Sequence, residues 1–179
     1  ELDNGWSVDL SIAHKNAAAY STTTVTVGVP GLGDFLIIQG GSGTGIDRMD
    51  DMTPNVWEEA YGTGLGHTID TVGGASGGAG VEFTPSGTPD GLTARLAWSP
   101  NVGGSGSSDK GSSADDGSVK GQGFDITLEA SSDLLGMEGL TLYGGISQID
   151  TYQDGTAYND DSTEKTVGAK YSVGSFTLG

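Results

Sequence analysis

The sequence predicts an all-β protein, an antiparallel meander that belongs to the wall of a transmembrane β-barrel. Two observations predict this fold. Apolar and polar residues alternate along short segments, and the connections between those segments alternate between short and long. Both features recur from one end of the 179 residues to the other. We therefore expect residues 1–179 to form one β-domain rather than several.

Each predicted strand carries an apolar residue at every second position. These residues are Trp6, Val8, Leu10 and Ile12; Val25, Val27 and Val29; Ala79, Val81 and Phe83; Leu92, Ala94, Leu96 and Trp98; Phe124, Ile126, Leu128 and Ala130; Leu140, Leu142 and Ile146; Val167, Ala169, Tyr171 and Val173; and Phe176 and Leu178. The run Phe35–Ile38 is apolar on both faces, so the pattern leaves its orientation open. The alternation predicts about nine strands, the last of which is cut off at Gly179.

The lengths of the connections indicate how the strands are arranged. Short connections are expected at 30–33, 85–90, 131–138 and 174. Longer connections, at 15–20, 41–74, 100–120 and 151–162, take turns with them along the chain. A meander with its long loops at one end and its tight turns at the other is typical of membrane β-barrels.

The polar face of the predicted strands helps to separate a barrel wall from a soluble β-sandwich, whose strands also alternate. This face consists of Gly, Ser and Thr with isolated charges, which are Asp9, Glu82, Arg95, Asp125, Glu129 and Lys170. Such a face suits a water-filled lumen. The apolar positions given above include no charged residue, as lipid contact requires, because a charge at the bilayer midplane costs about 2–4 kcal/mol.

The aromatic residues favour the barrel further. If the long loops share one end, Trp98 and Phe124 lie near it. The residues expected near the opposite end are Trp6, Phe83, Tyr171 and Phe176. Two aromatic rims that enclose a band of Val, Leu, Ile and Ala are the girdles of an outer-membrane barrel.

The composition excludes several classes of protein. The chain has 7 Lys and Arg against 24 Asp and Glu, a formal net charge of −17, with 33 Gly and no Cys. This acidity argues against nucleic acid as a partner, because phosphate neutralisation needs clustered basic residues. Cations and polar solutes fit the charge better. No apolar run approaches the ~20 residues of a membrane-spanning helix.

The connection 41–74 is much longer than most loops between strands, and connections beyond ~12–15 residues usually have a function. Thr53 as a cap and Pro54 at the first helical position predict a short helix, within which Trp57 would anchor the loop to the wall. Its acidic residues are Asp47, Asp50, Asp51, Glu58, Glu59 and Asp70. If the loop folded into the lumen, these carboxylates would face Arg95 and Lys170 across the channel.

No arrangement of residues predicts an enzyme. The segment Gly74–Gly78 matches a Gly-x-Ser-x-Gly elbow, but a strand follows it where that motif needs a helix. The two histidines, His14 and His67, have no evident nucleophile beside them. Lys15, Arg48, Lys110, Lys120 and Lys165 lie in predicted loops or at strand ends, where a solvated role is the default.

The order of strand, short turn, strand and long loop, with DDMTPNVWEEAYG in the loop and GGAGVEFTPSGTPDGLTARLAWSP after it, resembles the general diffusion porins of the alphaproteobacterial type. The most specific part covers residues 46–99, and the rest matches in pattern. The resemblance implies that residues 41–74 are the third extracellular loop, folded inward as the constriction. It also implies a homotrimer in the outer membrane of a Gram-negative bacterium, in contact with lipid and lipopolysaccharide.

The resemblance implies a barrel of 16 strands, whereas this chain supplies about nine. We therefore expect the chain to be part of a longer porin, without its first two and about its last five strands. A complete eight-stranded barrel is the rival, although Gly, Ser and Thr would leave its interior unfilled.

The function expected from the resemblance is passive diffusion of small hydrophilic solutes and ions, with a mild cation preference and no required cofactor. Asp47, Asp50 and Asp51 could bind Ca²⁺ through hard oxygen ligands. Two alternatives stay open. One is a soluble acidic β-domain that binds calcium or carbohydrate, and the other is a barrel that serves mainly as a surface receptor or adhesin.

Overall fold

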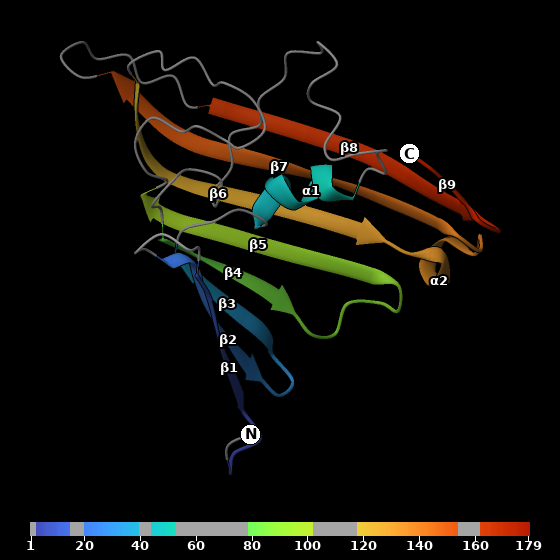
Figure 1. Ribbon diagram of the computed structural model, residues 1–179, viewed down its shortest axis with the longest axis horizontal. Helices are drawn as coiled ribbons and strands as arrows, with labels where there is room; N and C mark the ends of the chain where they lie inside the picture. Colours follow the sequence, from blue (N-terminus) through green and yellow to red (C-terminus); the bar gives the residue numbers. More distant parts are fainter. Residues whose placement is uncertain (1–2, 15–19, 40–43, 53–78, 102–117, 154–161) are drawn as a thin grey trace.

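The computed structural model describes residues 3–14, 20–39, 44–52, 79–101, 118–153 and 162–179. Within them, nine antiparallel strands form one sheet in chain order (Figure 1). The strands are β1 (Ser7–His14), β2 (Tyr20–Val29), β3 (Gly33–Gln39), β4 (Ala79–Pro85), β5 (Leu92–Asn101), β6 (Ser118–Ala130), β7 (Leu140–Gln153), β8 (Ser162–Val173) and β9 (Phe176–Leu178). The predicted all-β meander is confirmed. In the described residues β1 and β9 are edge strands, so the sheet is not closed.

The register puts mostly polar residues in one row across the sheet and mostly apolar residues in the next. One row runs through Asp9, Thr26, Leu36, Glu82, Ala97, Asp125, Ser147 and Glu164. The neighbouring row runs through Val8, Val27, Phe35, Phe83, Leu96, Ile126, Ile146 and Lys165. Successive residues of a strand point to opposite faces, so the first row belongs to a polar face and the second to an apolar face. These two names are kept below.

The run Phe35–Ile38, whose orientation the sequence left open, is now assigned. Leu36 pairs with Glu82, so Leu36 and Ile38 lie on the polar face. Phe35 lies on the apolar face, where its ring stacks on that of Phe83 with centroids 4.6 Å apart. β3 therefore contributes apolar side chains to both faces of the sheet.

The strand bounds confirm where the predicted connections lie, but their lengths alternate only in part, because residues 131–139 form a longer connection than residues 15–19 or 154–161. Residues 15–19, 40–78, 102–117 and 154–161 separate strands at one end of the sheet, the long-connection end. Residues 30–32, 86–91, 131–139 and 174–175 separate them at the other, the short-connection end. Backbone hydrogen bonds join neighbouring short turns: the N–H groups of Ser86, Ser131 and Ser172 donate to the carbonyls of Leu32, Gly91 and Gly139.

The described helical segments are brief. The 3₁₀ turn η1 (Gly45–Asp47) leads directly into α1 (Arg48–Asp51), and α2 (Ser132–Leu135) lies in the turn between β6 and β7. Helical backbone was predicted after Pro54, and these residues fall outside the described part of the chain, whereas η1 and α1 begin earlier and were not predicted. Among the described helices, none has the length and apolar character that a membrane-spanning helix requires.

The register can be tested by cross-linking, because the chain has no native Cys. Ile126→Cys with Ile146→Cys places two cysteines directly opposite one another on β6 and β7. Opposite residues lie about 4.5–5.5 Å apart between Cα atoms, within the range that a disulfide spans. We expect this pair to oxidise nearly completely, as measured by the mobility of the unreduced protein.

The matched control joins Ile126→Cys with Gln148→Cys, which lies one pair further along β7 on the same face. Diagonal neighbours lie about 7–8 Å apart, so this pair should oxidise poorly. Preferential oxidation of the control pair would show that the register is shifted by two residues.

Candidate functional site

The candidate site is the segment of residues 44–52, which packs on the polar face of β5–β8. η1 contacts β5, β6 and β7, and α1 contacts β7 and β8. Figure 1 shows α1 lying against the sheet beside β6 and β7, rather than beyond its edge. Ile46 and Met49 are buried, at 0% and 1% exposure. Their burial contributes about 1.5–3 kcal/mol each, which helps to hold the segment on the wall.

Two carboxylates of the wall accept hydrogen bonds from the backbone of η1. The Gly45 N–H donates to Glu82 Oε2 at 2.9 Å, and the Ile46 N–H donates to Asp125 Oδ2 at 2.8 Å. Glu82 also forms an ion pair with the Arg48 guanidinium. Both carboxylates are buried, at 3% and 1% exposure, where an ionised group must be paired. The segment therefore supplies donors that these two wall residues need.

Two glycines allow this close approach. Gly45 has φ +59, and a Cβ on it would lie 1.8 Å from Asp125 Oδ2. A Cβ on Gly145 of β7 would lie 2.6 Å from Ile46 Cγ2, so its absence makes room for the isoleucine. Larger residues would force the segment away from the wall. The fit between η1 and the sheet thus depends on glycine from both sides.

The basic residues predicted on the wall have different surroundings. Arg95 Nη1 lies 3.5 Å from Glu129 Oε2, and both side chains are partly exposed on the polar face. Arg95 Nη1 itself is buried and has no hydrogen-bond partner among the described residues, so the two groups attract one another by charge without a hydrogen bond. Lys170 pairs in register with Thr141 and lies on the same face, partly exposed. The structure therefore places both residues on the polar face, with Arg95 already matched by a carboxylate.

The predicted constriction residues are only partly described. Asp47 belongs to η1, and Asp50 and Asp51 belong to α1, so their backbone lies on the polar face while their side chains are outside the description. Glu58, Glu59, Asp70 and the predicted anchor Trp57 lie outside the described residues altogether. Within the part of the chain that is described, no three His, Asp or Glu side chains are arranged to hold a metal ion.

Sequence reasoning missed Arg48, Glu82 and Asp125 as residues of this site. Glu82 and Asp125 were expected on the polar face, where the structure has them, but not as acceptors for the loop backbone. Arg48 was expected to be solvated, and the structure shows instead that it pairs with Glu82. The sequence offered no signal for this role, because it does not contain the register that puts the small residues Ala97 and Ser147 opposite these carboxylates.

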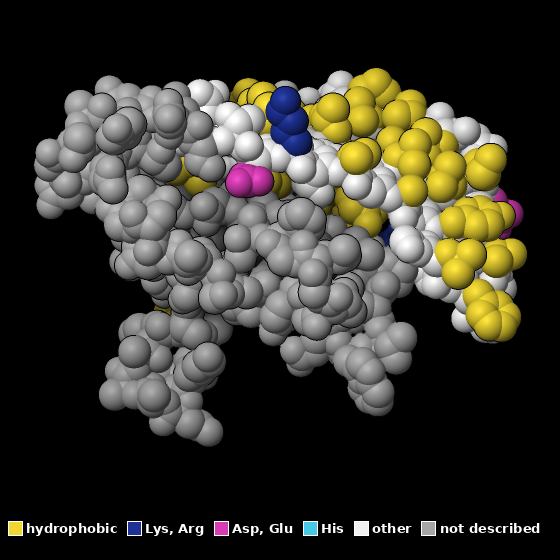
Figure 2. Space-filling model, turned by 90° about the horizontal axis from the view of Figure 1, so that it is seen from above, with side chains coloured by type: hydrophobic (Ala, Val, Ile, Leu, Met, Phe, Trp, Pro, Cys, Tyr) yellow, Lys and Arg dark blue, Asp and Glu magenta, His cyan; other side chains and the backbone are white. Residues whose placement is uncertain are grey.

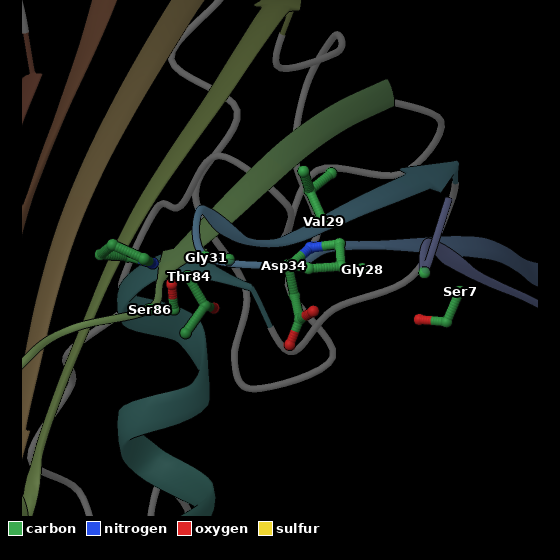
Figure 3. A pocket seen from close by; sticks show the side chains of 11 residues that line it. Ser7, Gly28, Val29, Gly31, Asp34, Thr84 and Ser86 are labelled. Carbon is green, nitrogen blue, oxygen red and sulfur yellow. The ribbon is translucent and has the colours of Figure 1, made fainter. Parts of the chain in front are cut away.

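A hollow of about 350 Å³ lies at the short-connection end of β1–β4. Ser7, Gly28, Asp34 and Thr84 follow one another in register across it. Figure 3 shows the Asp34 side chain projecting from β3 beside Gly28. Glycines and turn residues make up most of the remaining lining, so the hollow presents a single carboxylate and few other polar side chains.

The apolar face is the exposed face of the described sheet. Figure 2 shows hydrophobic side chains gathered over one side of the molecule. On β6, Phe124, Ile126 and Leu128 are about half exposed, at 48–50%, while the alternating Asp125 and Thr127 are buried. The predicted girdle residues on this side are Trp6, Trp98, Phe124, Tyr171 and Phe176, all exposed, and Phe83, half-buried against Phe35. Apolar side chains are thus exposed and polar ones buried, the reverse of what the surface and core of a water-soluble protein usually show.

The outward positions of the apolar face form runs of constant length. On β5–β8 the outward runs are Leu92–Trp98, Phe124–Ala130, Leu140–Ile146 and Val167–Val173, each with four outward positions. At the short-connection end, Leu92 stands opposite Ala130, so the runs of β5 and β6 end level. Ala130 stands opposite Leu142, so the run of β7 extends two residues further, to Leu140. Leu140 stands opposite Tyr171, so the run of β8 extends two residues further again, to Val173. The runs therefore shift by four residues over three strand-to-strand steps. With a rise of ~3.3 Å and a strand spacing of ~4.8 Å, strands inclined by about 40° would bring them to one level.

A comparison of the chain with protein-family models, with curated proteins and with solved structures found no match. The function is therefore argued from the residues and their geometry.

The contacts of η1 predict how its amides exchange with solvent. Glu82→Ala and Asp125→Ala each remove a charged acceptor, which is worth about 1.5–3 kcal/mol per hydrogen bond. Each substitution should therefore speed exchange in residues 44–49 by roughly tenfold or more, as measured by hydrogen–deuterium exchange mass spectrometry. Glu129→Ala is the control, because Glu129 lies on the same face and pairs with Arg95 instead. Equal exchange in all three variants would contradict the role of the two acceptors.

Proposed function

We propose that this chain belongs to an outer-membrane porin, through which small hydrophilic solutes and ions diffuse passively. The observation that supports this proposal most is that the sheet exposes its apolar face and buries its polar face. Leu96, Phe124 and Ile126 are exposed on one face, while Asp125, Thr127 and Ser147 are buried on the other. An exposed apolar sheet face in water would be an aggregation hazard, whereas a bilayer solvates it. We infer that the apolar face contacts lipid and the polar face contacts the aqueous lumen.

The geometry of the apolar band supports the same proposal. Its stagger corresponds to strands inclined by about 40°, and strands of membrane barrels tilt by roughly 35–45°. Trp98 and Phe124 lie at the long-connection end of the band, with ring centroids 6.5 Å apart. Tyr171 and Phe176 lie near the short-connection end. Aromatic residues at both borders suit the two interfaces of a membrane.

The segment 44–52 supplies the second part of the proposal. It packs on the polar face rather than on an edge of the sheet, held by Glu82 and Asp125. In a closed barrel, this position would put the segment inside the lumen, where it would narrow the pore. The protein would act by excluding large solutes and by ordering water at the constriction, without a chemical step.

The remaining parts of the proposal concern selectivity and assembly. The net charge of −17 favours cations over anions near the pore. The barrel would assemble as a homotrimer in the outer membrane of a Gram-negative bacterium, in contact with lipid and lipopolysaccharide. These statements rest on the resemblance to alphaproteobacterial porins and on the charge.

Planar-bilayer recording tests the pore. The complete detergent-extracted protein should give discrete conductance steps that come in groups of three. Deletion of residues 47–61 removes α1 and the segment after it, so we expect the conductance of each step to rise. The control deletes residues 102–116, a segment of equal length between β5 and β6, and should leave the conductance close to that of the parent protein. A protein that stays soluble without detergent and never conducts would overturn the proposal in favour of a soluble β-domain.

Ion selectivity gives an independent test. In a salt gradient of potassium chloride, the reversal potential should have the sign of a modest cation preference, because the chain carries 24 acidic against 7 basic residues. The preference should weaken as the ionic strength rises, since salt screens the field of exposed charges. A reversal potential of the opposite sign would refute the expected selectivity while leaving the pore itself intact.

A further inference from the structure

The ion pair between Arg48 and Glu82 has a polarity opposite to the one that the sequence predicts for this site. The sequence predicts carboxylates on the loop that face basic residues of the sheet. The structure instead joins a cation of the segment 44–52 to a carboxylate of the polar face. Arg95, one of the predicted basic residues, lies beside a carboxylate of the sheet itself, Glu129. At this contact, the segment therefore supplies the positive charge and the sheet the negative one.

The Glu82 carboxylate is bound to the segment through both of its oxygens. Its Oε2 accepts the Gly45 N–H at 2.9 Å, and its Oε1 pairs with the Arg48 guanidinium. The Glu82 side chain is 3% exposed, whereas that of Arg48 is 21% exposed. A carboxylate buried this deeply needs a counter-charge, and only the guanidinium supplies a full unit of it. The pair thus carries no net charge, and Arg48 is the member that solvent reaches.

Arg48 makes a large contribution to the charge balance of this part of the polar face. Among the described side chains on the polar face of β4–β6, the acidic residues are Glu82, Asp125 and Glu129, and the basic residue is Arg95. Arg48 brings a second positive charge to this region from the segment. Removing it would leave a carboxylate without the charge that cancels its own.

We propose that Arg48 is a selectivity-determining residue, which lowers the preference of the pore for cations by cancelling the charge of Glu82. This inference rests on the proposed function, because it requires ions to pass along the polar face. The segment 44–52 packs on that face, with Ile46 and Met49 buried, so a charge on the segment lies at the proposed constriction. An ion that passes there feels the sum of two charges in contact with one another.

Arg48 also helps to hold the segment on the sheet, but that role predicts a different result. If the ion pair only holds the segment, the loss of either partner loosens it, and both losses change selectivity in the same direction. If the charges act on ions, loss of Arg48 and loss of Glu82 change selectivity in opposite directions. The sign of the change in the two single variants therefore separates the two roles.

The test measures reversal potentials of the complete protein in planar bilayers, in a potassium chloride gradient at low ionic strength and pH 8. Arg48→Gln should raise the ratio of potassium to chloride permeability by about twofold or more, because one unit of charge near the ion path attracts one ion and repels the other. Glu82→Gln should lower the ratio by a similar factor. The double variant Arg48→Gln/Glu82→Gln should return it close to the wild-type value. Arg48→Lys keeps the charge and should keep the ratio.

Lys165→Gln is the matched control, because it removes one positive charge from the other face of the sheet. Lys165 lies within β8 and stands opposite Ile146 on the apolar face, whereas the sequence suggested a loop or a strand end. This variant should leave the permeability ratio unchanged. If Arg48→Gln does not insert into bilayers, the double variant compared with Glu82→Gln alone gives the same measurement.

Three results would overturn the assignment of Arg48. They are a shift of the same sign in Arg48→Gln and Glu82→Gln, a double variant that does not return towards the wild type, and a shift in Lys165→Gln as large as that in Arg48→Gln. Variants that conduct with unchanged selectivity would refute this role alone and leave the pore intact. A wild type that never conducts would refute the proposed function itself.

Discussion

The structure depends on one constraint, the two-residue alternation held in register across successive strands. Because Asp125 pairs with Ala97 on one side and Ser147 on the other, the polar row stays on one face from β4 to β8. A slip of one residue on a single strand would move its apolar residues to the polar face. The buried carboxylates of the polar face and the exposed apolar band both follow from that register.

The segment 44–52 is bound to the polar face by hydrogen bonds to buried carboxylates. Buried carboxylates need partners, and Glu82 and Asp125 obtain them from backbone N–H groups and from Arg48. The N–H groups at the start of a helical turn have no partner within that turn, so they are free to donate outward. Glycine at positions 45 and 145 gives the two surfaces the close approach that these bonds need. Wall and segment thus satisfy one another's polar groups.

The inverted polarity joins the fold to the proposed function. A water-soluble sheet protein hides its apolar face, whereas here Leu96, Ile126 and Ile146 remain exposed. Most of the buried side chains on the described strands are small or polar, so the described core is too slight to explain why the strands are so regularly apolar on the other face. Under the proposed function, lipid would solvate that face, which would account for its composition.

The sequence by itself determined the all-β class, the meander, the places of the connections and the composition of each face, because these are local properties, most of them with a period of two residues. It also determined that Arg95, Lys170, Glu82 and Asp125 would share the polar face. Only the tertiary structure decided which face Leu36 joins, that Arg48 pairs with Glu82, and that Lys165 stands opposite Ile146. Each depends on which residues of distant strands stand opposite one another, and alternation within a single strand does not contain the register between strands.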